Sequence, residues 1–533
     1  MVSQQGQITG RRCDLADQAG NRSPSDHGAW VSIRSKFSEV KEADSEFPYS
    51  RIRVLTGLIL LAVLTHVAFN VWNILQDPNF SHDPLGRVLG ANGGTDVTIG
   101  DVASFSLGSQ ADFLRAPFFG IVRFVTYALF GFSTSALALT MVVINAVLGT
   151  LLLYLIVEKL FGSRVALIAG LLNATYFDSL IFPSVRTSYS NLNFVFVLGM
   201  IYLFLKHLDG RHSRKIMILS ALVYGFALNT DSKLLLFPIL ELGAIAFLLK
   251  GLHKTDFVRT AVCYLGFAIV LMPFLVRNYA YTGDFRPIQN NGTVAFASAL
   301  ARFDNSHFVN EDYPWIYTEE EATARGMVHT DSAEKAIVPA VRAEMREALR
   351  DDPFLFVTSS AYNFIRIVLP WTLHDETLKG RFVKGVGPQR TEVPDGTEDE
   401  VGLREGGSGL SLSGRVVRYL HRELGILWSV VLDAFDLVVR VLIFLVPMLL
   451  PVCYLLGVLN LVWRREFQIL LITLLPVIYY SGTLTWILVN PDYLLASNFT
   501  FLTLASVALN SLWGLTRHTE RRGAGSSSVT TPT

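Results

Sequence analysis

Five aspartates in one polar stretch are the residues with the clearest capacity for chemistry. They lie between two apolar segments, and Arg115-Ala116-Pro117 follows them where apolar sequence resumes; the five are Asp77, Asp83, Asp96, Asp101 and Asp112. A carboxylate at a membrane surface can take a proton from an acceptor hydroxyl, and a nearby cation can hold a departing phosphate. The pattern is compatible with group transfer from a lipid phosphate. It is also compatible with solvated turn aspartates beside an arginine that anchors the interface.

Further charged residues interrupt later apolar segments. Asp231 and Lys233 separate two such segments, and Arg277 follows Pro273 at the end of another. Lys233 can snorkel to the interface beside a local counter-ion, or it can contact a phosphate. Arg277 breaks the charge pattern described below, which favours a functional role. Glu241 falls at membrane depth, so we expect it to face the interior of a helix bundle.

Composition and motifs disfavour other classes of chemistry. Lys+Arg and Asp+Glu balance at 45 each, so the chain offers no basic face of the kind that binds nucleic acid. A GxxxxGK[ST] loop, an HExxH motif and a nucleophile elbow are all missing. The three cysteines are far apart without CxxC spacing, so we expect neither a disulfide nor zinc. The sequence identifies no cofactor; a divalent metal is possible, but no ligand set defines one.

Membrane helices must position these residues. The chain is 51% hydrophobic and 17% charged, against about 25% charged in ordinary soluble domains. We predict an all-α polytopic membrane protein with about ten transmembrane helices, because a span needs about 20 apolar residues. The predicted spans are 53–75, 134–157, 165–182, 189–206, 216–231, 234–249, 259–276, 436–462, 468–489 and 494–515. The apolar segment 116–132 contains Arg123, which favours an interfacial helix.

Positive charge in the short loops predicts the orientation, because cytoplasmic loops accumulate lysine and arginine. With both termini cytoplasmic, the inner segments carry Lys159, Arg164, Lys206, Arg211, Arg214, Lys215, Lys250, Lys254, Arg259, Arg464, Arg465, Arg517, Arg521 and Arg522. The predicted regions are a disordered cytoplasmic tail at 1–50, a transmembrane domain at 51–276 with an outer loop at 75–116, an extracytoplasmic α or α/β domain at 277–432, C-terminal transmembrane helices at 433–516 and a disordered cytoplasmic tail at 517–533.

Four stretches occur in an order typical of one known group of enzymes. They are the acidic loop running through Arg115-Ala116-Pro117, then Phe161–Gly170, Tyr224–Lys233 and Pro273–Gly292. In this order the chain resembles the GT-C membrane glycosyltransferases, in the branch that includes protein mannosyltransferases, the lipid A aminoarabinose transferase and bacterial core-oligosaccharide transferases. The likeness covers residues 53 to 300.

The resemblance implies a donor, a site and a location. In such proteins an aspartate of the first outer loop serves catalysis, and the sugar arrives on a polyprenyl phosphate. Carried onto this chain, Asp96 or Asp101 would be the base, and Arg115 with Lys233 or Arg277 would hold the donor phosphate. The acceptor would be a glycan, lipid or protein, and membrane lipids would surround the helices. We expect the protein in a bacterial inner membrane.

Two other functions stay open from the sequence. A transporter or lipid flippase would have inverted repeats and polar groups near the membrane midplane, and neither is evident. A noncatalytic relative that binds a glycolipid fits the places where family residues are missing. One such place is Asp492-Tyr493, where many relatives have an Arg-Tyr pair.

Overall fold

The computed structural model describes residues 50–76, 118–131, 134–175, 190–209, 214–282, 346, 349–352, 354–368, 449–484 and 497–525. Within these ranges the chain forms helices and turns, without a strand. The elements are α2 (Arg51–Gln76), α5 (Phe118–Phe130), α6 (Thr134–Ile144), η3 (Asn145–Gly149), α7 (Thr150–Phe161), α8 (Ser163–Thr175), α10 (Ser190–Leu208), α11 (Arg214–Thr230), η4 (Ser232–Leu236), α12 (Phe237–Leu249), α13 (Lys254–Thr282), α17 (Phe354–Val368), α21 (Phe467–Leu484) and α22 (Asn498–Gly525).

A described helix overlaps each of the ten predicted spans, the eighth of them at Leu449–Trp463. On length and apolar composition, three helices of the described part could cross a membrane: Arg51–Val71, Ser135–Phe161 and Lys254–Val276. The part of the chain that the structure describes therefore confirms a helical membrane protein. Ten crossings and the region boundaries stay predictions, and most of the segment 277–432 lies outside the described residues.

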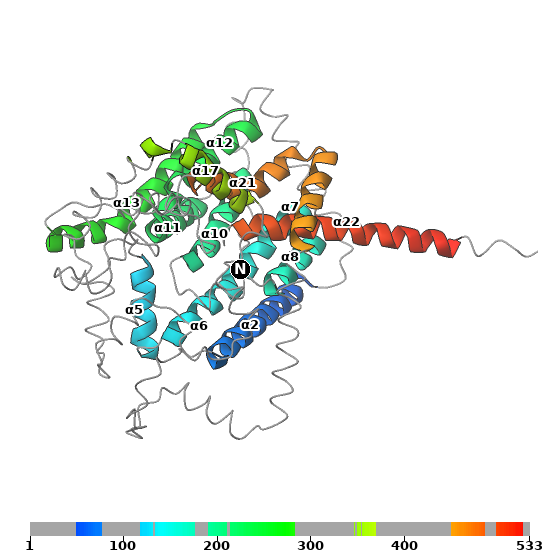
Figure 1. The fold of residues 1–533 in the computed structure, drawn as a ribbon, viewed down its shortest axis with the longest axis horizontal. Coiled ribbons are helices and arrows are strands. Elements are labelled where there is room, and N and C mark those ends of the chain that lie inside the picture. Colours follow the sequence, from blue (N-terminus) through cyan, green and yellow to red (C-terminus); the bar gives the residue numbers. More distant parts are fainter. Residues whose placement is uncertain are drawn as a thin grey trace, which may run out of the picture.

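Close helix contacts depend on glycine. A methyl group on Gly266 of α13 would lie 2.1 Å from the carbonyl oxygen of Ala221 on α11, and one on Gly225 would lie 2.8 Å from the carbonyl oxygen of Gly266. Small residues at such crossings let two helix backbones approach, which is a common way to pack helices in lipid. Figure 1 shows α10, α11 and α13 gathered on one side of the bundle. These helices carry most of the polar contacts described below.

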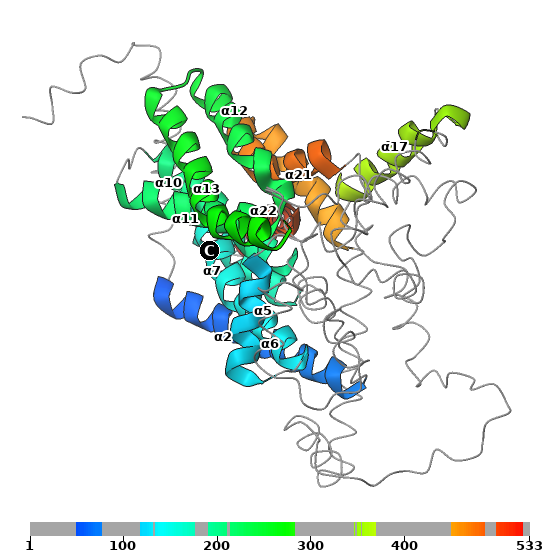
Figure 2. The same ribbon diagram turned by 90° about the vertical axis from the view of Figure 1, so that its left-hand side faces the viewer.

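The C-terminal helices complete the bundle. Gly457 approaches Leu504 of α22 as closely as Gly266 approaches Ala221, and α22 also packs on α8. The second half of α22 extends beyond the other helices (Figure 1). Figure 2 shows α17 beside α21, and Ile367 of α17 is buried there. Thus α21 links the N-terminal helices to a helix from the predicted outer region.

Ion pairs connect several helix ends on one side of the bundle. They are Arg51–Glu158, Lys159–Asp209 and His207–Asp256, and the hydroxyl of Ser163 donates to Glu158. These contacts join the first residues of α2, α8 and α13 to the last residues of α7 and α10. The charge pattern of the sequence predicts that all five helix ends lie on the same, cytoplasmic side of the membrane. The contacts agree that these ends share one side.

Which side faces the cytoplasm can be measured by cysteine labelling in a variant without native cysteines. A membrane-impermeant maleimide is expected to label Ser332→Cys in intact cells, because the charge pattern places 277–432 outside. The control Ser527→Cys, in the C-terminal tail, should react only after permeabilisation. Labelling of Ser332→Cys only after the membrane is opened from the cytoplasmic side would reverse the predicted orientation.

Candidate functional site

The structure describes the surroundings of one predicted site side chain. Lys233 lies in η4, between α11 and α12. Asp96, Asp101 and Arg115 lie outside the described residues, and Arg277 belongs to α13 with its side chain outside the described part. The geometry around Lys233 is therefore the starting point for the candidate site.

Lys233 belongs to a short segment, Asp231–Leu236, that we call the lysine turn. Asp231 has an extended backbone (φ −143°, ψ 111°), and its Oδ1 accepts a hydrogen bond from the backbone N–H of Lys233 at 3.0 Å. This is the N-cap interaction that aspartate favours at a helix start. Asn193 of α10 donates from Nδ2 to the other oxygen, Oδ2, at 2.7 Å. Asp231 is 1% exposed, so its carboxylate holds the turn from inside the bundle.

Tyr479 of α21 holds the other side of the lysine turn. Its hydroxyl donates to the carbonyl oxygen of Lys233 and accepts from the backbone N–H of Leu236 at 3.1 Å. The tyrosine ring packs edge-on against Phe237, with ring centroids 5.1 Å apart. The Nζ atom of Lys233 is buried. A cation in such a place interacts with an anion more strongly than one in bulk water, because the local dielectric constant is lower.

The start of α5 lies near the same end of the bundle. The ring of Phe118 packs 4.7 Å from Phe226 of α11 and 5.8 Å from Phe196 of α10, between centroids. By helical rise, Phe226 is about 7.5 Å from Asp231 along its helix, and Phe196 is about 4.5 Å from Asn193. The chain that follows the acidic loop therefore enters the bundle beside the helix ends that carry the lysine turn.

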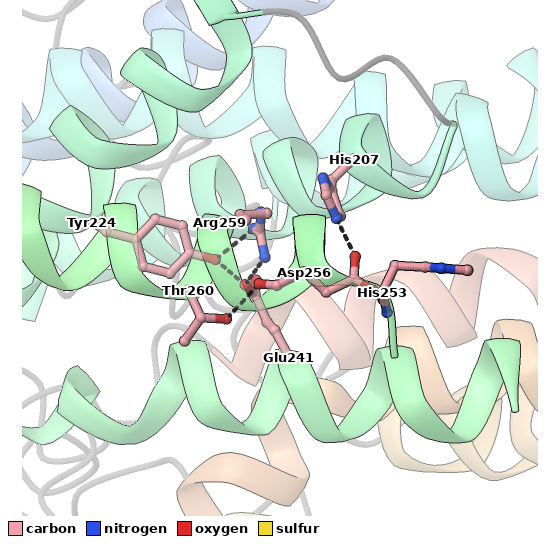
Figure 3. Close-up of polar contacts among 7 residues, drawn as sticks. All are labelled: His207, Tyr224, Glu241, His253, Asp256, Arg259 and Thr260. Atoms are coloured by element: carbon pink, nitrogen blue, oxygen red, sulfur yellow. Dashed lines mark hydrogen bonds and ion pairs between the residues drawn. The ribbon is translucent and has the colours of Figure 1, made fainter. Parts of the chain in front are cut away.

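A second buried polar cluster joins α11, α12 and α13 (Figure 3). Glu241 of α12 accepts from Arg259 Nη1 at 2.9 Å and from the hydroxyl of Tyr224, and Arg259 Nη2 donates to the same hydroxyl at 3.1 Å. The guanidinium also lies over the rings of Phe204 and Tyr224, 5.8 and 5.6 Å from their centroids. Glu241 is 0% exposed, which confirms the prediction that it faces the bundle interior.

Arg259 corrects one part of the sequence analysis. It was counted among the basic residues of an inner loop, yet it lies within α13 and its side chain is 2% exposed. The ion pair with Glu241 explains this position, because a buried guanidinium needs a counter-ion. One turn before Arg259, Asp256 pairs with His207 Nε2 at 2.7 Å (Figure 3). The same carboxylate accepts from the backbone N–H of His253 at 2.8 Å.

Sequence reasoning missed several of these groups. Asn193 and Tyr479 lie within apolar stretches, and Tyr224 opens the motif Tyr224–Lys233 without an assigned role. The available signal was the amide or hydroxyl itself, because a polar group in lipid has to find a partner. Among the described residues, no three His, Cys, Asp or Glu side chains group as a metal site would need. Asp96 and Asp101 lie outside that part of the chain.

The helices and the lysine turn define a class: a helical membrane protein with a buried lysine Nζ on a turn whose backbone is held by Asp231 and Tyr479. Residues 115–279 match the model of a family described as dolichyl-phosphate-mannose-protein mannosyltransferase. Comparison with curated proteins and with solved structures gives no match. The matched segment runs from Arg115 into α13 and contains the lysine turn. The resemblance to GT-C membrane glycosyltransferases is confirmed, and the match supports a polyprenyl-phosphate-linked sugar donor.

Proposed function

We propose that the protein transfers a sugar from a polyprenyl-phosphate donor to an extracytoplasmic glycan, lipid or protein acceptor. The observation that carries the proposal is the family match over 115–279, which includes the lysine turn and its buried cation. When the sugar of such a donor is transferred, the leaving group is the polyprenyl phosphate. A fixed cation stabilises the negative charge that develops on this phosphate.

The phosphate contacts are Arg115, Lys233 and Arg277. Arg115 precedes Phe118 by three residues, and three residues reach at most about 10 Å. Phe118 packs against α10 and α11 near the lysine turn, so the length of the chain allows Arg115 to reach this end of the bundle. Arg277 belongs to α13, which packs closely on α11. In this arrangement three cations contact one lipid phosphate.

The acidic loop supplies the base. Asp96 or Asp101 takes the proton from the acceptor hydroxyl while its oxygen bonds to the anomeric carbon of the sugar. The bond from that carbon to the phosphate oxygen breaks, and its electron pair leaves with the polyprenyl phosphate. The cations oppose this growing negative charge, which makes their contacts stronger in the transition state than in the bound donor.

Substitution of Arg115 tests the donor site. In proteoliposomes supplied with a sugar-charged polyprenyl phosphate, Arg115→Ala is expected to lower kcat/KM about 10- to 100-fold, the range for loss of a hydrogen bond to a charged group. Arg115→Lys keeps the charge without the planar fork, so we expect partial recovery. Arg53→Ala, an exposed arginine at the start of α2, serves as the control and should match the wild type.

Other outcomes separate the alternatives. An unchanged kcat/KM for Arg115→Ala would remove Arg115 from the site. Folded wild-type protein that binds the sugar-carrying polyprenyl phosphate without transferring the sugar would be a noncatalytic glycolipid-binding protein. Folded protein that moves the lipid between leaflets without transferring its sugar would be a flippase.

A further inference from the structure

We infer that Tyr479 of α21 is a positioning residue for the donor phosphate, acting through the backbone of Lys233. The inference rests on the proposed function, in which Lys233 contacts that phosphate. It adds a helix to the site, because α21 (Phe467–Leu484) lies outside the matched segment 115–279 and all residues predicted for the site precede it.

The hydroxyl of Tyr479 contacts two backbone groups of the lysine turn that are three residues apart. It donates to the carbonyl oxygen of Lys233 and accepts from the N–H of Leu236. A 3₁₀ helix pairs these same two groups, the carbonyl of residue i with the N–H of residue i+3. The hydroxyl of Tyr479 therefore contacts the same two backbone groups that a 3₁₀ hydrogen bond would join. It does so from a helix that is distant in the sequence.

Both backbone polar groups of Lys233 are thereby held by side chains. Asp231 accepts from its N–H, and Tyr479 donates to its carbonyl oxygen. The two side chains are themselves fixed, Asp231 by Asn193 and Tyr479 by ring contacts with Phe237. With its backbone fixed, Lys233 can change the position of its buried Nζ only through its own side-chain torsions.

This rigidity matters for transfer. A cation that is in place before the donor arrives needs no rearrangement when charge grows on the leaving phosphate. Loss of the Tyr479 hydroxyl would leave the ring contact with Phe237 and remove both backbone contacts at the turn. The effect on transfer should then depend on Lys233, because Tyr479 itself does not touch the phosphate in this arrangement.

A double-mutant cycle tests that dependence, with kcat/KM measured in proteoliposomes. Tyr479→Phe is expected to lower kcat/KM about 10-fold in the wild type, since one hydroxyl that satisfies two backbone groups is lost. In the Lys233→Met background, the same change should have less than about a 2-fold effect. Tyr480→Phe is the matched control: it is the next residue, equally buried, and its hydroxyl has no hydrogen-bond partner among the described residues.

Each outcome decides a different point. An equal loss from Tyr479→Phe in both backgrounds, or no loss in either, overturns the inference and leaves the proposed function standing. Full activity of Lys233→Met removes Lys233 from the donor site and overturns the inference with it. If Tyr479→Phe does not fold, hydrogen exchange of the wild type decides: a protected Leu236 amide supports the contact, and a freely exchanging one overturns it.

Discussion

Replacing the proposed base by asparagine is expected to lower sugar transfer about 100-fold or more, because positioned acid-base catalysis typically contributes that much. Asparagine keeps the size and much of the hydrogen bonding of aspartate but cannot accept the proton. Asp96→Asn and Asp101→Asn are therefore compared separately, with transfer from a polyprenyl-phosphate donor measured in proteoliposomes and folding checked by gel filtration. The variant with the large loss identifies the base.

Two other aspartates of the acidic loop provide controls for this comparison. Asp77→Asn and Asp83→Asn remove the same charge from the same loop and should stay near the wild type. Full activity of both Asp96→Asn and Asp101→Asn in folded protein would refute the assignment of the base. The transporter and glycolipid-binding alternatives would then explain the chain better.

The largest effect on stability is expected from Arg259→Met. This change leaves Glu241 buried without its counter-ion, and breaking a buried ion pair typically costs about 3–5 kcal/mol. The midpoint of thermal unfolding in detergent, followed by tryptophan fluorescence, should fall strongly. The exposed Arg214→Met, at the start of α11, is the control and should unfold like the wild type.

The double variant Arg259→Met/Glu241→Gln separates loss of the pair from loss of packing. A neutral glutamine no longer needs the guanidinium and can still bond to the hydroxyl of Tyr224, so much of the stability should return. If the double variant is as unstable as Arg259→Met alone, contacts of Arg259 with Phe204 and Tyr224 carry the stability instead of charge pairing.

The helices could be predicted from the sequence because apolar length is a local property. The apolar composition of segments such as 189–206 and 259–276 predicts helices, and α10 and α13 lie there. Contacts between helices are not local. Arg259 was counted with the basic residues of an inner segment because it stands at the start of the predicted span 259–276, and its counter-ion Glu241 is 18 residues away on another helix. The hydropathy of a segment does not predict which charged residues of different helices form an ion pair.

The candidate site shows the same division. Lys233 was predicted for the site because it separates two apolar segments and the motif Tyr224–Lys233 resembles a known family, and its contact with a phosphate stays a prediction. The side chains that hold the lysine turn were not predicted, since Asn193 is 38 residues from Asp231 and Tyr479 is 246 residues from Lys233. A lone amide or hydroxyl in an apolar run shows only that it needs a partner, and the fold decides which one.

The separation between Lys233 and Tyr479 has a consequence for biosynthesis. Chains grow from the N-terminus at about 5–20 residues per second, so Tyr479 leaves the ribosome roughly 12 to 50 s after Lys233. During that interval α11, α12 and α13 can enter the membrane while the lysine turn still lacks its contact with α21. A chain that terminates before α21 would thus contain every residue of the matched segment and still lack the contact between Tyr479 and the lysine turn. If Tyr479 positions Lys233 as we infer, the lysine turn reaches its final form only after the last helices have been made.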